Sequence, residues 1–154
     1  MKKIKPPSLS ETIMTEIVCP NDTNPMGILQ GGRLVQWMDI ASAVCAQNHS
    51  EHICVTASID SVKFKSPAKV GDIITIKARI TRAFNSSMEI FVQAWAKKVR
   101  GQQAYLINES YFTFVALDDN AKPVAVPTVK PGSVSEKKQF ADADKRKKSR
   151  LLSY

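Results

Sequence analysis

One helix-periodic segment, followed by several long strand-like segments, most constrains the fold of this chain. Residues 31–48 repeat with helical spacing, and one apolar stripe runs along Leu34, Met38, Ala41 and Cys45. The other faces of this segment carry small side chains, mostly alanine and serine. A sheet can therefore wrap closely around the helix.

The segments after the helix are typical of β-strands. Residues 72–84 alternate cleanly, with Ile74, Ile76, Ala78 and Ile80 on one face and lysine, arginine and threonine, up to Thr81, on the other. Further strands are expected at residues 12–19, 53–64, 87–99 and 103–117. The turn signals "NSS" and "RGQ" predict that the last three strands form an antiparallel meander. The sequence therefore predicts an α+β fold with one central helix and about five strands.

Aromatic side chains are expected on the sheet face that the helix leaves open. One helix covers only one face of such a sheet, and a second copy of the chain is expected to cover part of the other face. We therefore predict a homo-oligomer. The aromatic residues in question are Phe91, Trp95, Tyr105 and Tyr111.

The bulk composition indicates one globular domain. The chain has 154 residues, and no apolar run approaches the roughly 18 residues of a membrane span. The opening "MKKIKPPSLS" has lysines but no apolar core after them, which does not resemble a secretory signal. Three cysteines without a CxxC motif favour a reducing compartment over a disulfide framework. We expect a cytoplasmic protein without a membrane partner.

A metal site is one interpretation of the cysteine and histidine residues near the helix end. Cys45 and His49 are four residues apart and could share a helix face, as zinc ligands do. His52 and Cys54, however, are poorly spaced for a second ligand pair, and both Cys45 and Cys54 lie in apolar company. We therefore expect neither a metal nor a cofactor.

The C-terminal tail, residues 131–154, is strongly basic and could form a helix after a domain of residues 1–130. It contributes a large part of the net charge of +8. A solvated extension is one explanation, and a patch for a phosphorylated ligand, nucleic acid or a membrane surface is another. Nucleic-acid binding is disfavoured because the chain has no recognisable helix-turn-helix or RNP-like motif.

The stretch "NPMGILQGGRLVQWMD", residues 24–39, contains residues that are unfavourable in an apolar helix. Two glycines weaken a helix by roughly 1 kcal/mol each relative to alanine, and a carboxylate in an apolar stretch is costly unless it is paired. Each residue also has a structural explanation: Asn24 as a turn starter, Gly32 as a helix N-cap, and Asp39 as a partner of Arg33 or of a neighbouring chain. Locally unfavourable residues in an otherwise consistent sequence are typical of functional sites.

This stretch resembles the hotdog-fold acyl-CoA thioesterases, together with "VTASIDSVKFKSPAKVGD" (55–72), "NSSMEIFVQ" (85–93) and "FVALDDNAKPVAVP" (114–127). The resemblance spans roughly residues 10–130. It implies a hotdog fold, in which an antiparallel sheet wraps the long helix, two protomers pair edge to edge, and the active sites lie between them. Members usually have histidine where this chain has Pro25, and often Gly-Arg where it has Phe84-Asn85, which affects substrate preference.

The resemblance implies hydrolysis of acyl-CoA to a free carboxylic acid and coenzyme A. The N–H groups of Gly31 and Gly32 would stabilise the oxyanion, because a helix N-terminus offers free donors and partial positive charge. Asp39, desolvated by its apolar surroundings, would act as general base or as nucleophile. Asn24 of the opposite chain would orient the water or the thioester.

Residues remote from the thioester are expected to bind the rest of the substrate. These candidates are Ser86 and Ser87 at the Ser-Met turn, and Arg146, Lys147 and Arg150 in the basic tail. The acyl chain length, the choice between base and nucleophile, and the choice between a homodimer and a trimer of dimers stay open.

Two other functions would also use parts of this sequence. A hotdog hydratase or dehydratase would need a histidine with a carboxylate, but His49 and His52 fall at the wrong end of the helix. A non-catalytic acyl-CoA-binding module would keep the glycines and the basic tail but would not need Asp39.

Overall fold

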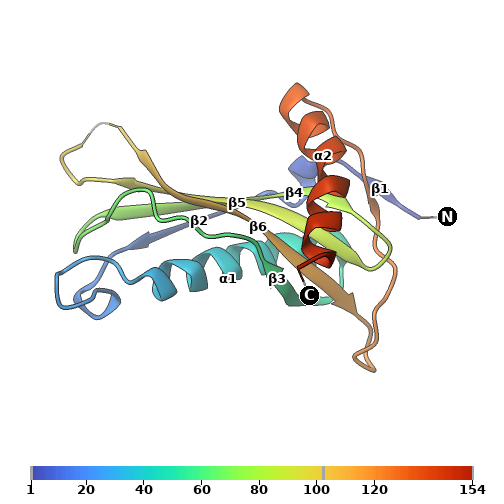
Figure 1. The fold of residues 1–154 in the computed structure, drawn as a ribbon, viewed down its shortest axis with the longest axis horizontal. Coiled ribbons are helices and arrows are strands. Elements are labelled where there is room, and N and C mark those ends of the chain that lie inside the picture. The colour runs from blue at the N-terminus through green and yellow to red at the C-terminus, as the bar shows by residue number, and fades with distance from the viewer. Residues whose placement is uncertain (1, 102, 154) are drawn as a thin grey trace.

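The fold of this computed structural model, which describes residues 2–101 and 103–153, is a curved antiparallel sheet with a helix on each face (Figure 1). Helix α1 (Gly31–Ser50) lies along the inner face of the sheet. The strand order is β2 (Thr12–Ile17), β4 (Ile73–Ala83), β5 (Ser87–Lys97), β6 (Tyr105–Leu117) and β3 (Ile53–Ile59). The predicted α+β architecture with one wrapped central helix is confirmed.

Short elements complete the chain. Strands β1 (Ile4–Lys5) and β7 (Thr128–Val129) pair in parallel, and two 3₁₀ turns span Pro7–Leu9 and Pro20–Asp22. The basic tail forms helix α2 (Val134–Leu151). Gln102 of the predicted "RGQ" turn and Tyr154 of the tail lie outside the described residues. In the part of the chain that the structure describes, neither helix is long and apolar enough to cross a membrane.

The core lies between α1 and the inner sheet face, as the periodicity predicted. The predicted helix stripe is buried, with Met38 and Ala41 at 0% exposure. The predicted apolar face of β4 is buried completely as well. Burying these side chains is the main term that stabilises such a layered fold. The two sets are Leu34, Met38, Ala41 and Cys45 on α1, and Ile74, Ile76, Ala78 and Ile80 on β4.

The docking of α2 and one bulge change two predictions about side-chain environment. The pairing of β4 with β5 shifts between Ile80 and Arg82, and Thr81 on the outer face is buried because its hydroxyl donates a hydrogen bond to Glu89, which Arg146 of α2 also binds. The pairing of β5 with β6 shifts near Trp95, and Tyr105 packs against the core. A bulge adds one residue to one strand, which changes the strict alternation that the sequence pattern assumes.

Strand β3 is shorter than predicted. It ends at Ile59 instead of residue 64, and beyond it Asp60 N–H donates to the Tyr111 carbonyl. Ser110 Oγ donates to the Asp60 carbonyl at 3.1 Å. Residues 61–68 run as an irregular segment past the start of α1, tied to β6 by the hydrogen bond from Lys65 N–H to the Ile107 carbonyl.

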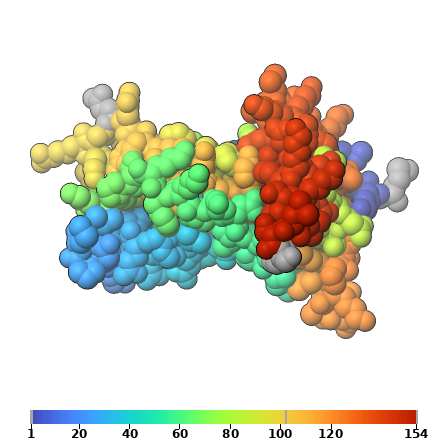
Figure 2. All heavy atoms as spheres, viewed as in Figure 1, coloured from blue at the N-terminus to red at the C-terminus, as the bar shows by residue number. Residues whose placement is uncertain are grey.

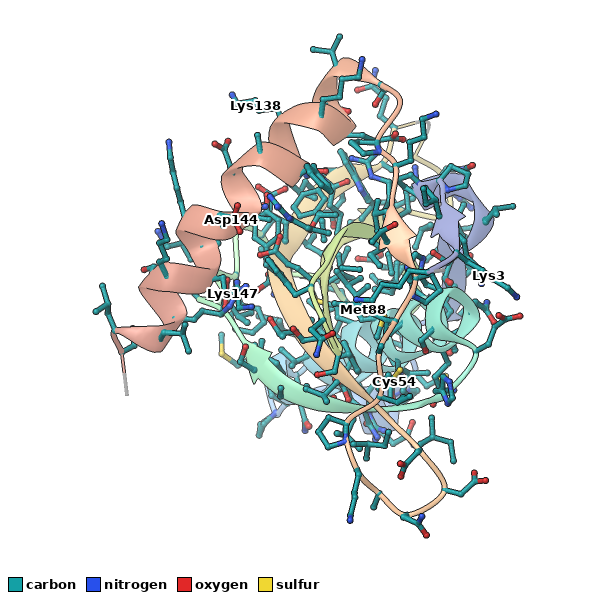
Figure 3. The ribbon with its side chains drawn as sticks, turned by 90° about the vertical axis from the view of Figure 1, so that its right-hand side faces the viewer. Lys3, Cys54, Met88, Lys138, Asp144 and Lys147 are labelled. Atoms are coloured by element: carbon teal, nitrogen blue, oxygen red, sulfur yellow. The ribbon has the colours of Figure 1, made fainter. Side chains whose placement is uncertain are left out.

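Helix α2 covers part of the outer sheet face, so the same chain shields Tyr111, one of the aromatic residues for which a second copy was predicted. Figure 3 shows the sheet between the two helices, with Lys138, Asp144 and Lys147 along α2. The Arg146 guanidinium lies 4.0 Å from the centre of the Tyr111 ring. Ser133 caps the helix through a capping box with Glu136.

A buried carboxylate anchors α2. Glu89 on β5 is 0% exposed, and it accepts hydrogen bonds from Arg146 Nη2 at 2.7 Å and from Arg150 Nη1 at 3.0 Å. Thr81 Oγ1 also donates to it, at 2.5 Å. A buried charge is tolerated only when it is paired and hydrogen-bonded in this way. The two arginines therefore fix the position of α2 on the sheet.

Strand β3 is the last strand at one end of the sheet. One edge of β3 has no partner strand among the described residues. Ile53 is 71% exposed and Val55 is 45% exposed, and Ile40 and Val44 on the adjoining side of α1 are also exposed. An unpaired edge bordered by apolar side chains is a surface suited to pairing with another chain.

Candidate active site

The start of α1 presents backbone donors. Gly31 and Gly32 are the first two helical residues, and the N-cap is Gln30, not Gly32. The Gln30 side chain makes no capping bond, and the first helical bond runs from Leu34 N–H to the Gln30 carbonyl. Within residues 2–101 and 103–153, the N–H groups of Gly31, Gly32 and Arg33 find no acceptor. They form an open anion-binding site of the kind that helix N-termini provide.

Gly32 borders open space. A Cβ built at this position would meet no atom within 4 Å, so the backbone there is accessible to another molecule. Gly31 differs, because a Cβ there would come within 2.7 Å of the Phe64 ring. The two glycines therefore have separate roles in the structure.

Asp39 lies further along α1 and faces β3. Its Oδ1 atom accepts a hydrogen bond from Thr56 Oγ1 at 2.7 Å, and the carboxylate is half-buried. Arg33 pairs with Asp22 at 3.2 Å, so the predicted alternative of an Arg33–Asp39 pair is wrong. The surroundings of Asp39 in one chain are also less apolar than predicted, because a hydroxyl group and solvent contact it.

Thr56 is the site residue that the sequence analysis missed. Strand alternation puts Thr56 on the same side of β3 as the buried Cys54, toward α1. That pattern could have predicted that Thr56 faces the helix. Which helix residue it would contact depends on how α1 lies across the sheet, which no local pattern contains.

Asn24 is held firmly in the loop before α1. Its Oδ1 accepts hydrogen bonds from the backbone N–H groups of Met26 at 2.9 Å and Ile28 at 3.2 Å. Gly27 completes the turn with φ at +72°, a conformation that favours glycine. The Asn24 NH₂ group donates to no acceptor in the described part of the chain. The turn therefore fixes the amide while its donor stays available.

One chain alone does not bring these groups to a single point. Asp39 follows Gly31 by two turns of α1, which places the two residues about 12 Å apart along the helix axis. A thioester carbonyl held at the helix start is therefore beyond the reach of Asp39 of the same helix. A second copy of the chain has to supply one of the two groups if both act on one substrate.

Three of the predicted substrate-binding residues line one small cavity. Ser87, Lys147 and Arg150 border a space of about 130 Å³, together with Ser58 and Phe84. Lys147 Nζ lies 4.0 Å from the centre of the Phe84 ring. Residues from the β4–β5 turn, from β3 and from α2 therefore meet beside the β3 edge. Figure 2 shows α2 and the segment after β3 side by side on one face of the molecule.

The other two predicted substrate-binding residues are placed differently. Arg146 lines a neighbouring cavity of about 530 Å³ with Arg150 and Ser149, and its guanidinium is engaged with Glu89. Ser86 uses its carbonyl to accept the Ala116 N–H at 3.0 Å, which stabilises the β4–β5 turn.

The cysteine and histidine residues near the end of α1 have other partners. Cys45 Sγ lies 3.8 Å from Ser10 Oγ, and burial raises the pKa of the Cys45 thiol to about 11. His49 Nε2 contacts the Pro127 carbonyl at 2.8 Å, and Cys54 Sγ lies 3.2 Å from Ser50 Oγ. Among the described residues, no three His, Cys, Asp or Glu side chains gather as a metal site.

Known proteins are similar to this chain in both sequence and fold. The thioesterase superfamily model matches residues 26–101. The uncharacterized acyl-CoA thioester hydrolase YkhA of Bacillus subtilis is 38% identical over 127 residues, which cover 82% of this chain and 74% of that protein. Mouse acyl-coenzyme A thioesterase 11 is 34% identical over 143 residues, which cover 93% of this chain and 24% of that protein. The chain therefore spans about a quarter of that longer relative.

Solved structures are similar to this chain over nearly its whole length. A hexameric acyl-CoA thioesterase crystallised without ligand superposes with a TM-score of 0.94 at 37% identity, covering 98% of this chain and 97% of that one. An acyl-CoA hydrolase variant from Staphylococcus aureus, in complex with coenzyme A, superposes with a TM-score of 0.92 at 37% identity, covering 99% and 93% of the two chains.

Variants of the Staphylococcus aureus hydrolase have alanine in place of one asparagine, one aspartate or one threonine. Those three residues have the same separations along their chain as Asn24, Asp39 and Thr56 have here. With the sequence identity and the fold, this agreement leads to one conclusion: the chain belongs to the thioesterase superfamily and has the hotdog fold of its acyl-CoA thioester hydrolases.

Proposed function

We propose that this protein hydrolyses acyl-CoA to a free carboxylic acid and coenzyme A at a site built from two chains. The observation that carries the proposal is the open set of N–H donors at Gly31 and Gly32, next to the fixed amide of Asn24. A thioester carbonyl bound there would have its developing oxyanion stabilised by donors that need no rearrangement. The relatives named acyl-CoA hydrolases support the substrate class.

The second chain supplies Asp39. Pairing of the free β3 edges would bring Thr56 and Asp39 of the partner subunit to the interface, because both lie beside that edge. The spacing of about 12 Å along one helix favours this arrangement over a site within one chain. Asn24 and the helix start of one chain would then face Asp39 of the other.

Two chemical routes fit a carboxylate at this position. As a general base, Asp39 takes a proton from water while the water oxygen adds to the carbonyl carbon. As a nucleophile, it forms an anhydride that water then hydrolyses. In both routes the C–S bond breaks, coenzyme A leaves as its thiolate, and a proton released by the water then converts this thiolate to the thiol. A single turnover in ¹⁸O-labelled water separates the routes, since only the anhydride route can leave label in the Asp39 carboxylate.

Thr56 acts as a positioning residue in this proposal. Its hydroxyl fixes one oxygen of the Asp39 carboxylate and leaves the other oxygen for water or the substrate. In the Staphylococcus aureus hydrolase, a threonine at the matching separation from the aspartate was replaced by alanine for structural and biochemical characterisation.

The nucleotide end of coenzyme A is assigned to the cavity beside α2. Its phosphates need cations and hydroxyl groups, and Ser87, Lys147 and Arg150 meet there, with Ser86 next in the turn. Arg146 and Arg150 already share Glu89, and Arg150 also pairs with Asp60 at 3.0 Å. Lys147 is therefore the cation most available to a phosphate, and Arg146 contributes by holding α2 in place.

The assembly that we propose is a homodimer or a trimer of dimers in the cytoplasm. The free β3 edge supports the dimer, and the hexameric relative supports the larger assembly. A relative from mouse is named a cytosolic acyl coenzyme A thioester hydrolase. Residues 1–130 would form the hotdog domain, and residues 131–154 would add α2 to its outer face.

Release of free thiol from a panel of acyl-CoAs tests the proposal directly. Thiol should appear with the wild-type protein, and a chelator should leave the rate unchanged because no metal takes part. Tight binding of acyl-CoA without thiol release would contradict hydrolysis and would favour a binding module.

A further inference from the structure

A separate apolar cavity begins at the first residue of α1. It measures about 380 Å³, within the range of about 300–1,000 Å³ that is typical of small-molecule pockets. Gly31 borders it, so the cavity adjoins the open N–H donors. Its walls come from the loop before α1, the first turn of α1, β6 and the segment after β3: Ile28, Leu29, Leu34, Phe64, Pro67 and Ile107.

Phe64 forms the outer wall of this cavity. The side chain is 58% exposed, whereas Leu34 and Ile107 on the inner side are 3% and 1% exposed. The ring lies directly against the helix start, because a Cβ on Gly31 would come within 2.7 Å of its Cζ atom. A large apolar ring on an irregular segment therefore stands between the cavity and solvent.

The cavity is not suited to a second charged group. Lys65 is the charged side chain that lines it, and Lys65 Nζ pairs with Glu109 at 3.3 Å. Apart from Ser66, the remaining lining side chains are apolar, and burying a carboxylate among them would be costly without a free cation. The chemistry of the walls therefore favours an alkyl chain over a dicarboxylic acyl group.

On the basis of the proposed hydrolase function, we propose that this cavity takes the acyl chain and that Phe64 limits the length of that chain. A carbonyl held by the N–H groups of Gly31 and Gly32 would have its alkyl substituent at the mouth of the cavity. The chain would then extend between Leu34 and the Phe64 ring. The ring closes the path toward solvent, so its size sets how many methylene groups the cavity accepts.

The test is a comparison of kcat/KM over saturated acyl-CoAs from acetyl to palmitoyl, with succinyl-CoA added. Phe64→Ala should raise the ratio of long-chain to short-chain kcat/KM by about 10-fold, since a few methylene contacts discriminate on this scale. Phe64→Trp should lower the same ratio. Phe64→Leu should shift it in the direction of Phe64→Ala by a smaller amount. Succinyl-CoA should be a poor substrate of every variant.

Val70→Ala is the matched control. Val70 follows in the same connection, is 49% exposed and does not line the cavity, so its truncation should leave the chain-length profile unchanged. Because Phe64 is largely exposed, its variants should fold, and circular dichroism would verify this. If each of Phe64→Ala and Phe64→Leu changed kcat/KM by the same factor for every chain length, the specificity role would be overturned while hydrolysis stands. Absence of thiol release from every acyl-CoA with the wild-type protein would instead overturn the proposed function, and this inference with it.

Discussion

Thr56 donates a hydrogen bond to Asp39 over 2.7 Å and thereby joins the free edge strand β3 to the central helix. The bond places the candidate catalytic carboxylate at the boundary where a second chain can pair. Asp39 itself lies two helical turns from the donors at the start of its own helix. This relationship is the basis of the first three predictions.

Asp39→Asn should lower kcat by about 10²–10⁴-fold, because the amide can act neither as a base nor as a nucleophile. The fold should be retained, since the two side chains have nearly the same shape and asparagine can still accept from Thr56. Steady-state kinetics and circular dichroism measure the two effects. Turnover near the wild-type rate would make Asp39 a structural residue.

Thr56→Val should reduce kcat by about 10-fold, the effect expected when one hydrogen bond to a charged group is lost. Thr56→Ser keeps the hydroxyl and should stay close to wild-type kcat. Steady-state kinetics with one acyl-CoA compares the two variants. Equal losses in both would mean that the methyl group, and not the hydrogen bond, matters.

Mixing inactive Asn24→Ala and Asp39→Ala proteins should restore part of the activity if the two residues act across chains. A mixed dimer contains one intact site and one doubly altered site, so up to half of the activity of a wild-type dimer returns in that species. Activity is followed after subunit exchange, which labelled chains verify. Full exchange without recovery would show that each site is built from one chain.

Arg146→Ala should destabilise the protein by about 3 kcal/mol, because it leaves the buried Glu89 carboxylate with one arginine instead of two. Urea unfolding measures the loss. Lys148→Ala, on the exposed side of the same helix, should change stability by less than about 0.5 kcal/mol. A raised KM with unchanged stability would instead show that Arg146 binds coenzyme A directly.

The protein should lose stability as the pH falls below about 6.5, in part through His49. Burial lowers the pKa of His49 from its ordinary value of 6.5, although the Pro127 carbonyl partly opposes this shift. The unfolded chain then binds a proton that the folded chain does not, and stability falls with pH in that window. Urea unfolding at pH 7.5 and pH 5 measures the difference. His49→Gln should reduce it, and an unchanged difference would exclude His49 as its source.

Local patterns in the sequence determined most of the fold. The stripe from Leu34 to Cys45 predicted the buried face of α1, and the alternation from Ile74 to Ile80 predicted the inner face of β4. Both predictions succeeded because helix and strand periodicities are properties of neighbouring residues. The resemblance to a known family singled out Asn24, the two glycines and Asp39 before any contact was known.

Tertiary structure alone decided which distant residues meet. A bulge between β5 and β6 brought Tyr105 onto the core, and the docking of α2 buried Thr81 on the outer face. The basic tail became a helix docked on Glu89, which precedes Arg146 by 57 residues. The contact between Thr56 and Asp39 likewise depends on where α1 crosses the sheet. A charge or hydroxyl group in a sequence indicates that a partner is needed, but only the packing of the layers determines which partner comes within hydrogen-bond distance.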